Sequence, residues 1–309
     1  MTYRAIVCIF LEGGNDSFNM VVPSDLAGHN VYAASRGPLA IPRNSLLPIA
    51  PRSGAGNRAW GVHPAAPALR DLFESSRLSV VANVGTLLQP TTKTQYLSNS
   101  VPLPAQLFSH SDQSTLWQLP SALDNTPHGW AGRMADFVLA MNGNSLLSPA
   151  ISIVGEARLL RGQTVRPFSL SPDGSAGIYA TWGGDGARRL QTLLQMQATS
   201  YPHVFQRHVA AMQQEALAVH AAIQTALAGV APLSTSFPTD NLAKQLHMVA
   251  RMISARQGLG VQRQVFFVRQ SGYDTHTSQH AQHPLLLQQL GEALAAFQDA
   301  MDALNIANG

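Results

Sequence analysis

The chain has 309 residues, enough to bury a sizeable core as one large domain or two small ones. Only 12% of the residues are charged, the net charge is +3, and no basic run is longer than Arg188-Arg189, which excludes the basic stripe of a nucleic-acid-binding protein. The single cysteine, Cys8, excludes an intrachain disulfide, and no apolar stretch approaches the ~20 residues of a transmembrane helix.

The first half of the chain predicts short strands separated by polar loops. An apolar strand over residues 5–11 runs into a Gly-Gly turn, and this short apolar run is not typical of a signal peptide. A helix that begins near Pro64 and a second apolar strand over 78–84 follow. Residues 86–128 are rich in Thr, Ser, Gln, Pro and Asn, so we expect loop with short helical pieces there.

The second half predicts longer helices and two further strands. In chain order we expect a helix within 129–142, a strand within 148–155, an irregular stretch over 156–200, helices over about 202–228 and 239–257, a strand over 263–270 and an amphipathic helix from Pro284. Because strands alternate with helices, the pattern is typical of an α/β protein with a mostly parallel sheet covered on both faces.

Three polar loops follow predicted strands. They are Gly-Gly-Asn-Asp-Ser at 13–17, Ser-His-Ser-Asp-Gln at 109–113 and Gly-Tyr-Asp-Thr-His at 272–276. In open α/β sheets, ligand sites lie just beyond the carboxyl ends of the strands. Asp, Ser and His are residue types that bind zinc-like metals or act as activated nucleophiles. Asp16 is therefore a candidate metal ligand, and the alternative is a turn former whose carboxylate caps the backbone.

The loop at 109–113 allows two interpretations. Ser111 or Asp112 could simply cap a short helix. Alternatively, a serine at a helix N-terminus is well placed to attack a phosphate or sulfate, because the backbone N–H groups and the helix dipole stabilise the bound anion. Ser109 and His110 lie in the same cluster.

The stretch SGYDTHTSQHAQH combines one acid with three histidines. Asp274 and His276 alternate just past a strand, so both side chains can face one point. His280 and His283 continue at helical spacing, but Pro284 disfavours helical backbone at the residue before it. We expect His280 and His283 to face solvent or the loop rim, with His280 the better placed of the two to join a site. The stretch therefore predicts half of a metal site.

These motifs, in this order, resemble those of one family. The segments FLEGGNDSFNMVVP, GVHPAAPALRDLFESSRLSVVANVG, SHSDQ, GWAGR, FPTDNLAKQLHMVARMI and GYDTHTSQ resemble the bacterial domain-of-unknown-function family fifteen-oh-one. That family is grouped with the alkaline phosphatase and sulfatase superfamily. The resemblance covers about residues 4–304, and several linked motifs in one order are more specific than any one of them.

The resemblance implies an alkaline-phosphatase-like three-layer α/β/α fold in a single domain over residues 1–309, with an irregular and helical insertion at about 156–240. Members are often exported by a twin-arginine leader, which this sequence does not show, so the resemblance also implies a periplasmic location. The family pattern continues with a strand carrying a Ser-Glu-Phe-Gly-Arg-like motif and then Asp-His-Gly, whereas this sequence ends at Asn-Ile-Ala-Asn-Gly. We therefore expect a C-terminally shortened form of the fold.

The resemblance further implies a metal-dependent hydrolase of phosphate or sulfate esters that acts on a small anionic substrate. The implied cofactor is a divalent metal, with zinc the first candidate. The residues that match the family's motifs are Asp16, Asp274 and His276 as metal ligands and Ser109 with His110 as the catalytic pair, with Ser111 the alternative nucleophile.

One alternative function belongs to another class, a non-catalytic binding or scaffold protein on the same fold. The family's C-terminal motifs, which would carry further metal ligands and do not occur in this sequence, favour this alternative. A dinucleotide-binding protein is disfavoured, because no G-x-G-x-x-G follows the first strand. The sequence predicts no nucleic-acid partner, and it does not decide the oligomeric state.

Overall fold

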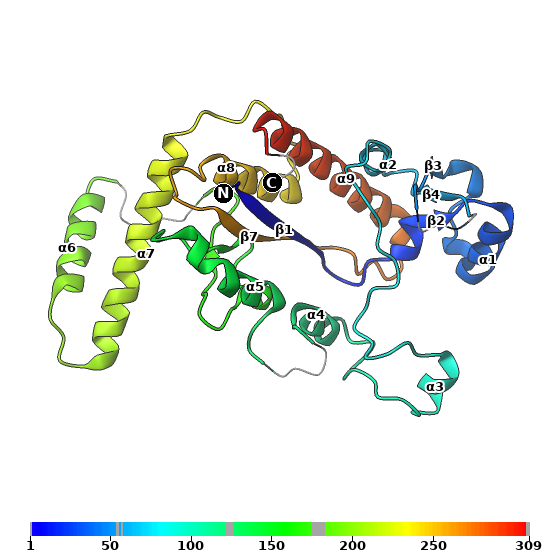
Figure 1. Ribbon diagram of the computed structural model, residues 1–309, viewed down its shortest axis with the longest axis horizontal. Helices are drawn as coiled ribbons and strands as arrows, with labels where there is room; N and C mark the ends of the chain where they lie inside the picture. Colours follow the sequence, from blue (N-terminus) through cyan, green and yellow to red (C-terminus); the bar gives the residue numbers. More distant parts are fainter. Residues whose placement is uncertain (1, 54–55, 57, 122–125, 175–182, 307–309) are drawn as a thin grey trace.

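A parallel β-sheet is the centre of the fold, in a computed structural model that describes residues 2–53, 56, 58–121, 126–174 and 183–306. Within these residues the sheet has the parallel strand order β1-β7-β5-β6 (Figure 1). The strands are β1 (Arg4–Leu11), β5 (Ala150–Ser152), β6 (Phe168–Ser169) and β7 (Arg263–Gln270). β1 and β7 pair over their full length, so the loops that follow them leave the sheet at the same edge.

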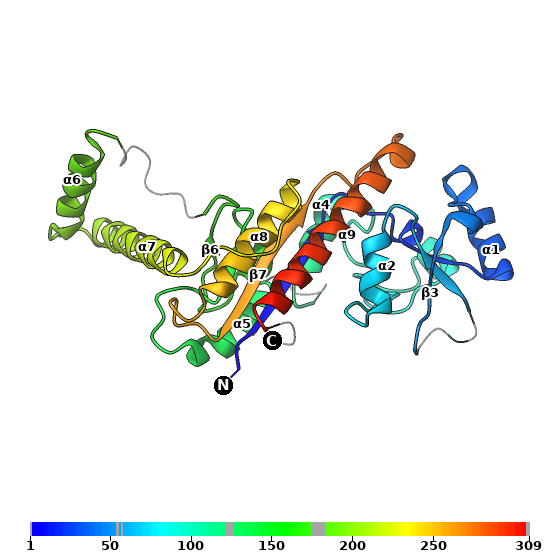
Figure 2. The same cartoon turned by 90° about the horizontal axis from the view of Figure 1, so that it is seen from above.

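Helices cover both faces of this sheet, as Figures 1 and 2 show from two sides. The covering helices are α5 (Trp130–Val138), α8 (Asn241–Ser254) and α9 (Gln279–Ala303). Phe266 and Val268 of β7 are buried in the core with α8 and α9, whereas Val265 and Phe267 are buried with α5. Because successive side chains of a strand point to opposite faces, the middle of a central strand covered on both sides is apolar at consecutive positions, as Val265 to Val268 of β7 are. The predicted α/β architecture with a mostly parallel sheet is confirmed.

A second, smaller sheet lies at one end of the molecule, beside the start of α9 (Figure 2). It is antiparallel with the order β2-β4-β3. Its elements are β2 (Val21–Pro23), α1 (Leu26–Arg36), β3 (Leu47–Ile49), β4 (Trp60–Val62) and α2 (Pro67–Glu74). Val22, Tyr32, Ile41 and Leu46 form a small core of their own, and α2 packs against α9.

The remaining helices lie in the connections. They are α3 (Lys93–Leu97), α4 (His110–Gln118), α6 (Gly186–Ala198) and α7 (Val204–Ala228), with short 3-10 helices at Ser17–Asn19, Gly37–Leu39, Arg43–Ser45, Leu139–Asn142 and Arg158–Leu160. Figure 1 shows α6 and α7 as a hairpin that projects away from the sheet. No helix in the described ranges is long and apolar enough to cross a membrane.

Two predictions made from the sequence differ from the fold. The strand predicted at 78–84 is wrong, because this segment pairs with no other strand within the described residues. Val81 and Val84 are exposed there, which shows that an apolar, β-branched run does not form a strand unless another strand is available to pair with it. Part of the stretch predicted as irregular at 156–200 is instead α6, whose Leu-, Gln- and Arg-rich sequence has high helix propensity.

Candidate functional site

Two glycines at the end of β1 bring three segments together. Gly13 has φ +109°, and a side-chain Cβ there would lie 2.6 Å from the backbone nitrogen of Asp274. Gly14 has φ +75°, and its Cβ would lie 3.0 Å from Cε1 of His110. The absence of side chains therefore lets the loop after β1 touch the loop after β7 on one side and the start of α4 on the other.

The carboxylate of Asp274 lies between two imidazole rings. Its Oδ1 is 3.0 Å from Nε2 of His276, and its Oδ2 is 3.9 Å from Nδ1 of His110. Asp274 and His276 thus contact each other, and His110 joins them from α4. His276 has a φ of +41°, a left-handed conformation that a non-glycine residue adopts at a cost and that is common at functional sites. All three side chains are open to solvent.

Beside this cluster is an open pocket of about 550 Å³. It runs from the C-terminal half of β1 across the Gly-Gly turn to the first turns of α4. Its polar lining includes Ser109 and His110, and its apolar lining includes Phe10, Phe108 and Trp117. Phe10 and Trp117 contact each other with ring centroids 5.8 Å apart. No Lys or Arg is among the described residues that line the pocket.

Ser109 is the N-cap residue of α4. Its Oγ accepts from the backbone N–H of Asp112 at 3.4 Å and donates to Oδ2 of the same residue at 2.5 Å. Oγ of Ser111 is 3.2 Å away. The capping interpretation therefore holds for Ser109 rather than for Ser111 or Asp112. It is compatible with the functional one, because the hydroxyl faces the positive end of the helix dipole and has a carboxylate beside it.

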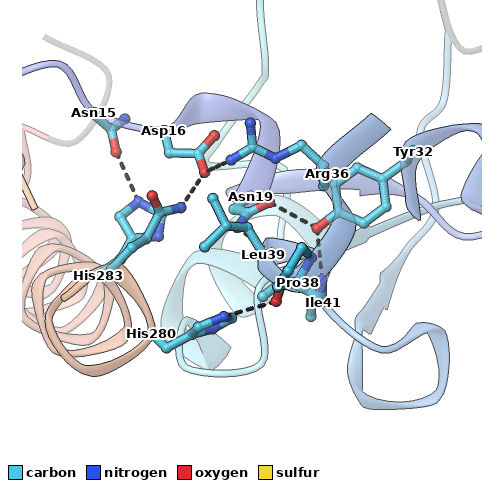
Figure 3. A network of polar contacts seen from close by, with 11 residues as sticks. Asn15, Asp16, Asn19, Tyr32, Arg36, Pro38, Leu39, Ile41, His280 and His283 are labelled. Atoms are coloured by element: carbon cyan, nitrogen blue, oxygen red, sulfur yellow. Dashed lines mark hydrogen bonds and ion pairs between the residues drawn. The ribbon is translucent and has the colours of Figure 1, made fainter. Parts of the chain in front are cut away.

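Asp16 is held by other partners. Its Oδ2 accepts hydrogen bonds from Arg36 of α1, which also forms an ion pair with it, and from Gln279 at the start of α9. Figure 3 shows the pairing of Asp16 with Arg36 beside the hydrogen bond that the Tyr32 hydroxyl donates to Oδ1 of Asn19. Nowhere in the described ranges do three or more His, Cys, Asp or Glu side chains converge in a way that could hold a metal ion. Asp16 thus lies on a neighbouring strand end, as expected, but its carboxylate is neutralised by an arginine.

The two histidines of α9 differ from each other (Figure 3). His280 is exposed, and its Nε2 is 2.8 Å from the backbone oxygen of Pro38. The prediction that His283 faces solvent is wrong, because it is only 2% exposed and its Nε2 lies 3.0 Å from Oδ1 of Asn15. α9 begins at Gln279 and continues through Pro284, so the conformation that proline disfavours is adopted at His283. Burial against neighbouring rings and the bond to Asn15 offset this preference.

The family model described as "Protein of unknown function (DUF1501)" matches residues 3–306. The chain belongs to this family. No curated protein and no solved structure matches the chain. Membership of DUF1501 confirms the family that the ordered motifs of the sequence predicted.

In this DUF1501 protein, several residues that shape the site carry no local sequence signal. Arg36 pairs with Asp16 from a helix that the sequence did not predict. Gln245 of α8 is fully buried. Its side-chain amide donates a hydrogen bond to the backbone carbonyl of Arg269 and accepts one from the backbone N–H of the same residue, both at 2.9 Å, and so fixes the end of β7. The sequence singles out the Gly-Gly pair, Asp16, Ser109 with His110, and Asp274 with His276 in this region.

The buried histidines of this DUF1501 protein predict a pH-dependent stability. Burial, and then the nearby His283, lower the pKa of His63 to about 4. The two rings contact each other with centroids 5.9 Å apart. Since the folded pKa lies below the value of about 6.5 for an unfolded chain, the neutral ring stabilises the fold above that pH, and this contribution is lost as the pH falls toward 4.

We therefore expect His63→Gln to remove a pH-dependent part of the free energy of unfolding, on the order of 2 kcal/mol between pH 7 and pH 4.5. Urea unfolding at both pH values measures it, with His280→Gln, at an exposed histidine, as the matched control. Equal pH dependence in the His63 variant and in the unmodified chain would contradict the assignment.

Proposed function

We propose that this protein is a hydrolase of phosphate or sulfate esters on an alkaline-phosphatase-like scaffold. The observation that supports the proposal best is the convergence at one sheet edge. There Ser109 and His110 line a pocket, and Asp274 with His276 meets His110 beside it. A nucleophile, a proton carrier and a metal-type carboxylate–imidazole pair are the parts that such a reaction needs.

Ser109 is the nucleophile in this proposal. Its hydroxyl hydrogen points to Asp112, which can accept the proton as Oγ attacks phosphorus or sulfur. The backbone N–H groups of the first turn of α4 and the helix dipole stabilise the negative charge of the group under attack. Attack forms the Oγ–P or Oγ–S bond and breaks the bond to the leaving oxygen, and water then hydrolyses the covalent ester.

His110 supplies the proton to the leaving oxygen. Oδ2 of Asp274 is 3.9 Å from its Nδ1, so the carboxylate lies beside the ring. The leaving group then lies in the aromatic part of the pocket, against Phe10, Phe108 and Trp117. Because no Lys or Arg of the described part of the chain lines this pocket, it suits an ester with an apolar or aromatic leaving group better than one with further charged groups.

A divalent metal, with zinc the first candidate, is implied by the superfamily resemblance but is only partly matched by the side chains. Asp274 and His276 supply two ligands, one fewer than the three that zinc sites normally have. Asp16, the third predicted ligand, already has a cationic partner in Arg36. A bound zinc would polarise the ester and lower the pKa of a hydroxyl, but the steps above are assigned to protein groups alone.

A binding or scaffold protein is the alternative, and the arrangement of Asp16 favours it. Its carboxylate is paired with Arg36 and hydrogen-bonded to Gln279, so it joins α1 and α9 to the loop after β1. A carboxylate in that role stabilises the fold and contributes nothing to chemistry. The same pocket would then bind a small apolar ligand without catalysing any reaction of it.

Zinc titration and an activity assay together test the proposal. We expect calorimetry to show weak zinc binding, which Asp274→Asn weakens further while Asp71→Asn, at an exposed acid, leaves it unchanged. We expect hydrolysis of 4-nitrophenyl phosphate or 4-nitrophenyl sulfate that Asp274→Asn reduces by about 10²-fold or more. One tightly bound zinc per chain would contradict the incomplete site. A lack of hydrolysis of both esters at every zinc concentration would favour the binding protein.

A further inference from the structure

The hairpin of α6 and α7, which we call the arm, is packed in an unusual way. Figures 1 and 2 show it extending away from the sheet. Where its two helices meet, polar side chains are on the inside. Gln197 is buried, its Nε2 is 3.3 Å from Oε1 of Gln213, and its backbone oxygen accepts from Gln214 at 2.9 Å. The contact between the two helices therefore includes glutamine side chains that hydrogen-bond across it.

Several apolar side chains in the first half of α7 are exposed on the outside of the arm. Phe205, Val209 and Met212 are 72%, 52% and 51% exposed, and Ala216 is exposed as well. Their spacing of four, three and four residues places them in one stripe on the helix surface, which we call the outer stripe. Gln213 and Gln214, which face α6, lie on other sides of the helix. A stripe of this spacing is typical of a helix that packs against another helix.

We propose that the outer stripe pairs with the same stripe of a second copy of this chain, with the two α7 helices antiparallel. The four residues of the outer stripe carry no charge, so two copies of the stripe bring no like charges together. Two-fold symmetric homodimers are the commonest assemblies, and they need a surface that is complementary to itself.

The polar residues beside the stripe bear on the register. His208 and Glu215 flank the outer stripe on the same side of α7, seven residues apart. When two such helices run antiparallel with Val209 of each copy beside Met212 of the other, His208 of one copy lies near Glu215 of the other, where the imidazole can hydrogen-bond the carboxylate. In a parallel pair, these flanks lie on opposite sides of the contact, so His208 and Glu215 of the two copies do not meet. The antiparallel arrangement is therefore the one that brings these two side chains together.

The size of the contact indicates a weak dimer. The free part of α7 is about 20 Å long at 1.5 Å per residue, and a helix is about 10 Å wide. A single pair of such helices buries an area at the low end of specific interfaces, below about 1,200 Å² in total. We therefore expect a dissociation constant on the order of 10 µM, which must be measured at high protein concentration.

Sedimentation velocity of the full chain from about 1 µM to about 200 µM tests the proposal. We expect a shift from monomer to dimer, and we expect Met212→Glu to raise the dissociation constant at least about 10-fold. Ala211→Glu adds the same charge to an exposed position on the other side of the same helix, so it should leave the dimer intact. A monomer at every concentration would overturn the proposal, as would a dimer that is equally sensitive to both substitutions.

Cross-linking tests the antiparallel register. Cys8 is the only cysteine, so Val209→Cys and Met212→Cys can each be made in a Cys8→Ala background. A mixture of the two variants should form a disulfide-linked dimer faster than either variant alone, because only unlike positions come within disulfide distance. Equal cross-linking in all three samples would overturn the register. Binding to anionic phospholipid vesicles that Met212→Glu abolishes, without any dimer, would assign the outer stripe to a membrane surface and overturn the proposal.

Discussion

Replacing Ser109 with alanine is expected to lower kcat for 4-nitrophenyl phosphate or sulfate by at least about 10³-fold. The substitution removes the Oγ that forms the covalent ester, and no other hydroxyl is both the N-cap of α4 and hydrogen-bonded to Asp112 within the described residues. Helix capping is lost as well, at about 1 kcal/mol. For this reason kcat must be measured together with the free energy of unfolding, so that a folding defect is not mistaken for a catalytic one.

The matched control is Ser111→Ala. Its Oγ is 3.2 Å from that of Ser109, so the two hydroxyls share one environment, but Ser111 neither caps α4 nor bonds Asp112. We expect its kcat to stay within about 3-fold of the unmodified chain, in line with the small effects of most surface substitutions. A large loss of kcat in Ser111→Ala together with a small loss in Ser109→Ala would make Ser111 the nucleophile instead of Ser109.

Gly13→Ala is expected to lower the free energy of unfolding by about 3 kcal/mol and to remove hydrolytic activity. At φ +109° any side chain is strained, and the new Cβ would lie 2.6 Å from the backbone nitrogen of Asp274. Neither backbone segment can yield by rotating a side chain, so the loops after β1 and β7 must move apart. Urea unfolding and the ester assay on the same preparation measure both effects.

Gly143→Ala tests the cost of a side chain at a positive φ in the absence of a steric clash. Gly143 has φ +57°, but its Cβ would meet no atom within 4 Å. We expect it to lower the free energy of unfolding by about 1 kcal/mol and to leave activity unchanged. If the two alanine variants behaved alike, the close approach of Gly13 to Asp274 would not matter for the site.

The long strands β1 and β7 and the short strand β5 were predictable from the sequence, whereas the strands of the smaller sheet were not. β1 and β7 are eight-residue runs with distinct ends, and their predicted limits agree with the structure to within one residue. β2, β3 and β4 have three residues each, too few for a periodic pattern to be recognised. The run at 78–84 has the composition of a strand but no partner in the described part of the chain, and pairing is a tertiary property that composition does not contain.

The candidate site was predictable where it depends on neighbouring positions in the sequence. Asp274 and His276 could be paired because they alternate past a strand, and the structure brings them within 3.0 Å. The pairing of Arg36 with Asp16 joins segments that only the folded chain brings together. His283 was predicted to face solvent because proline disfavours helical backbone at the residue before it. Burial against His63 and the hydrogen bond to Asn15 outweigh that local preference.

Isolation of the covalent ester tests the central claim most directly. The full chain is mixed with 4-nitrophenyl phosphate labelled in its phosphoryl group, the reaction is stopped with acid, and the labelled peptide is identified by mass spectrometry. We predict a phosphoryl group on Ser109, absent from the Ser109→Ala variant and present in Ser111→Ala. A chain that hydrolyses the ester with the label on Ser111, or with no covalent label at all, would contradict the assignment of Ser109 as the nucleophile.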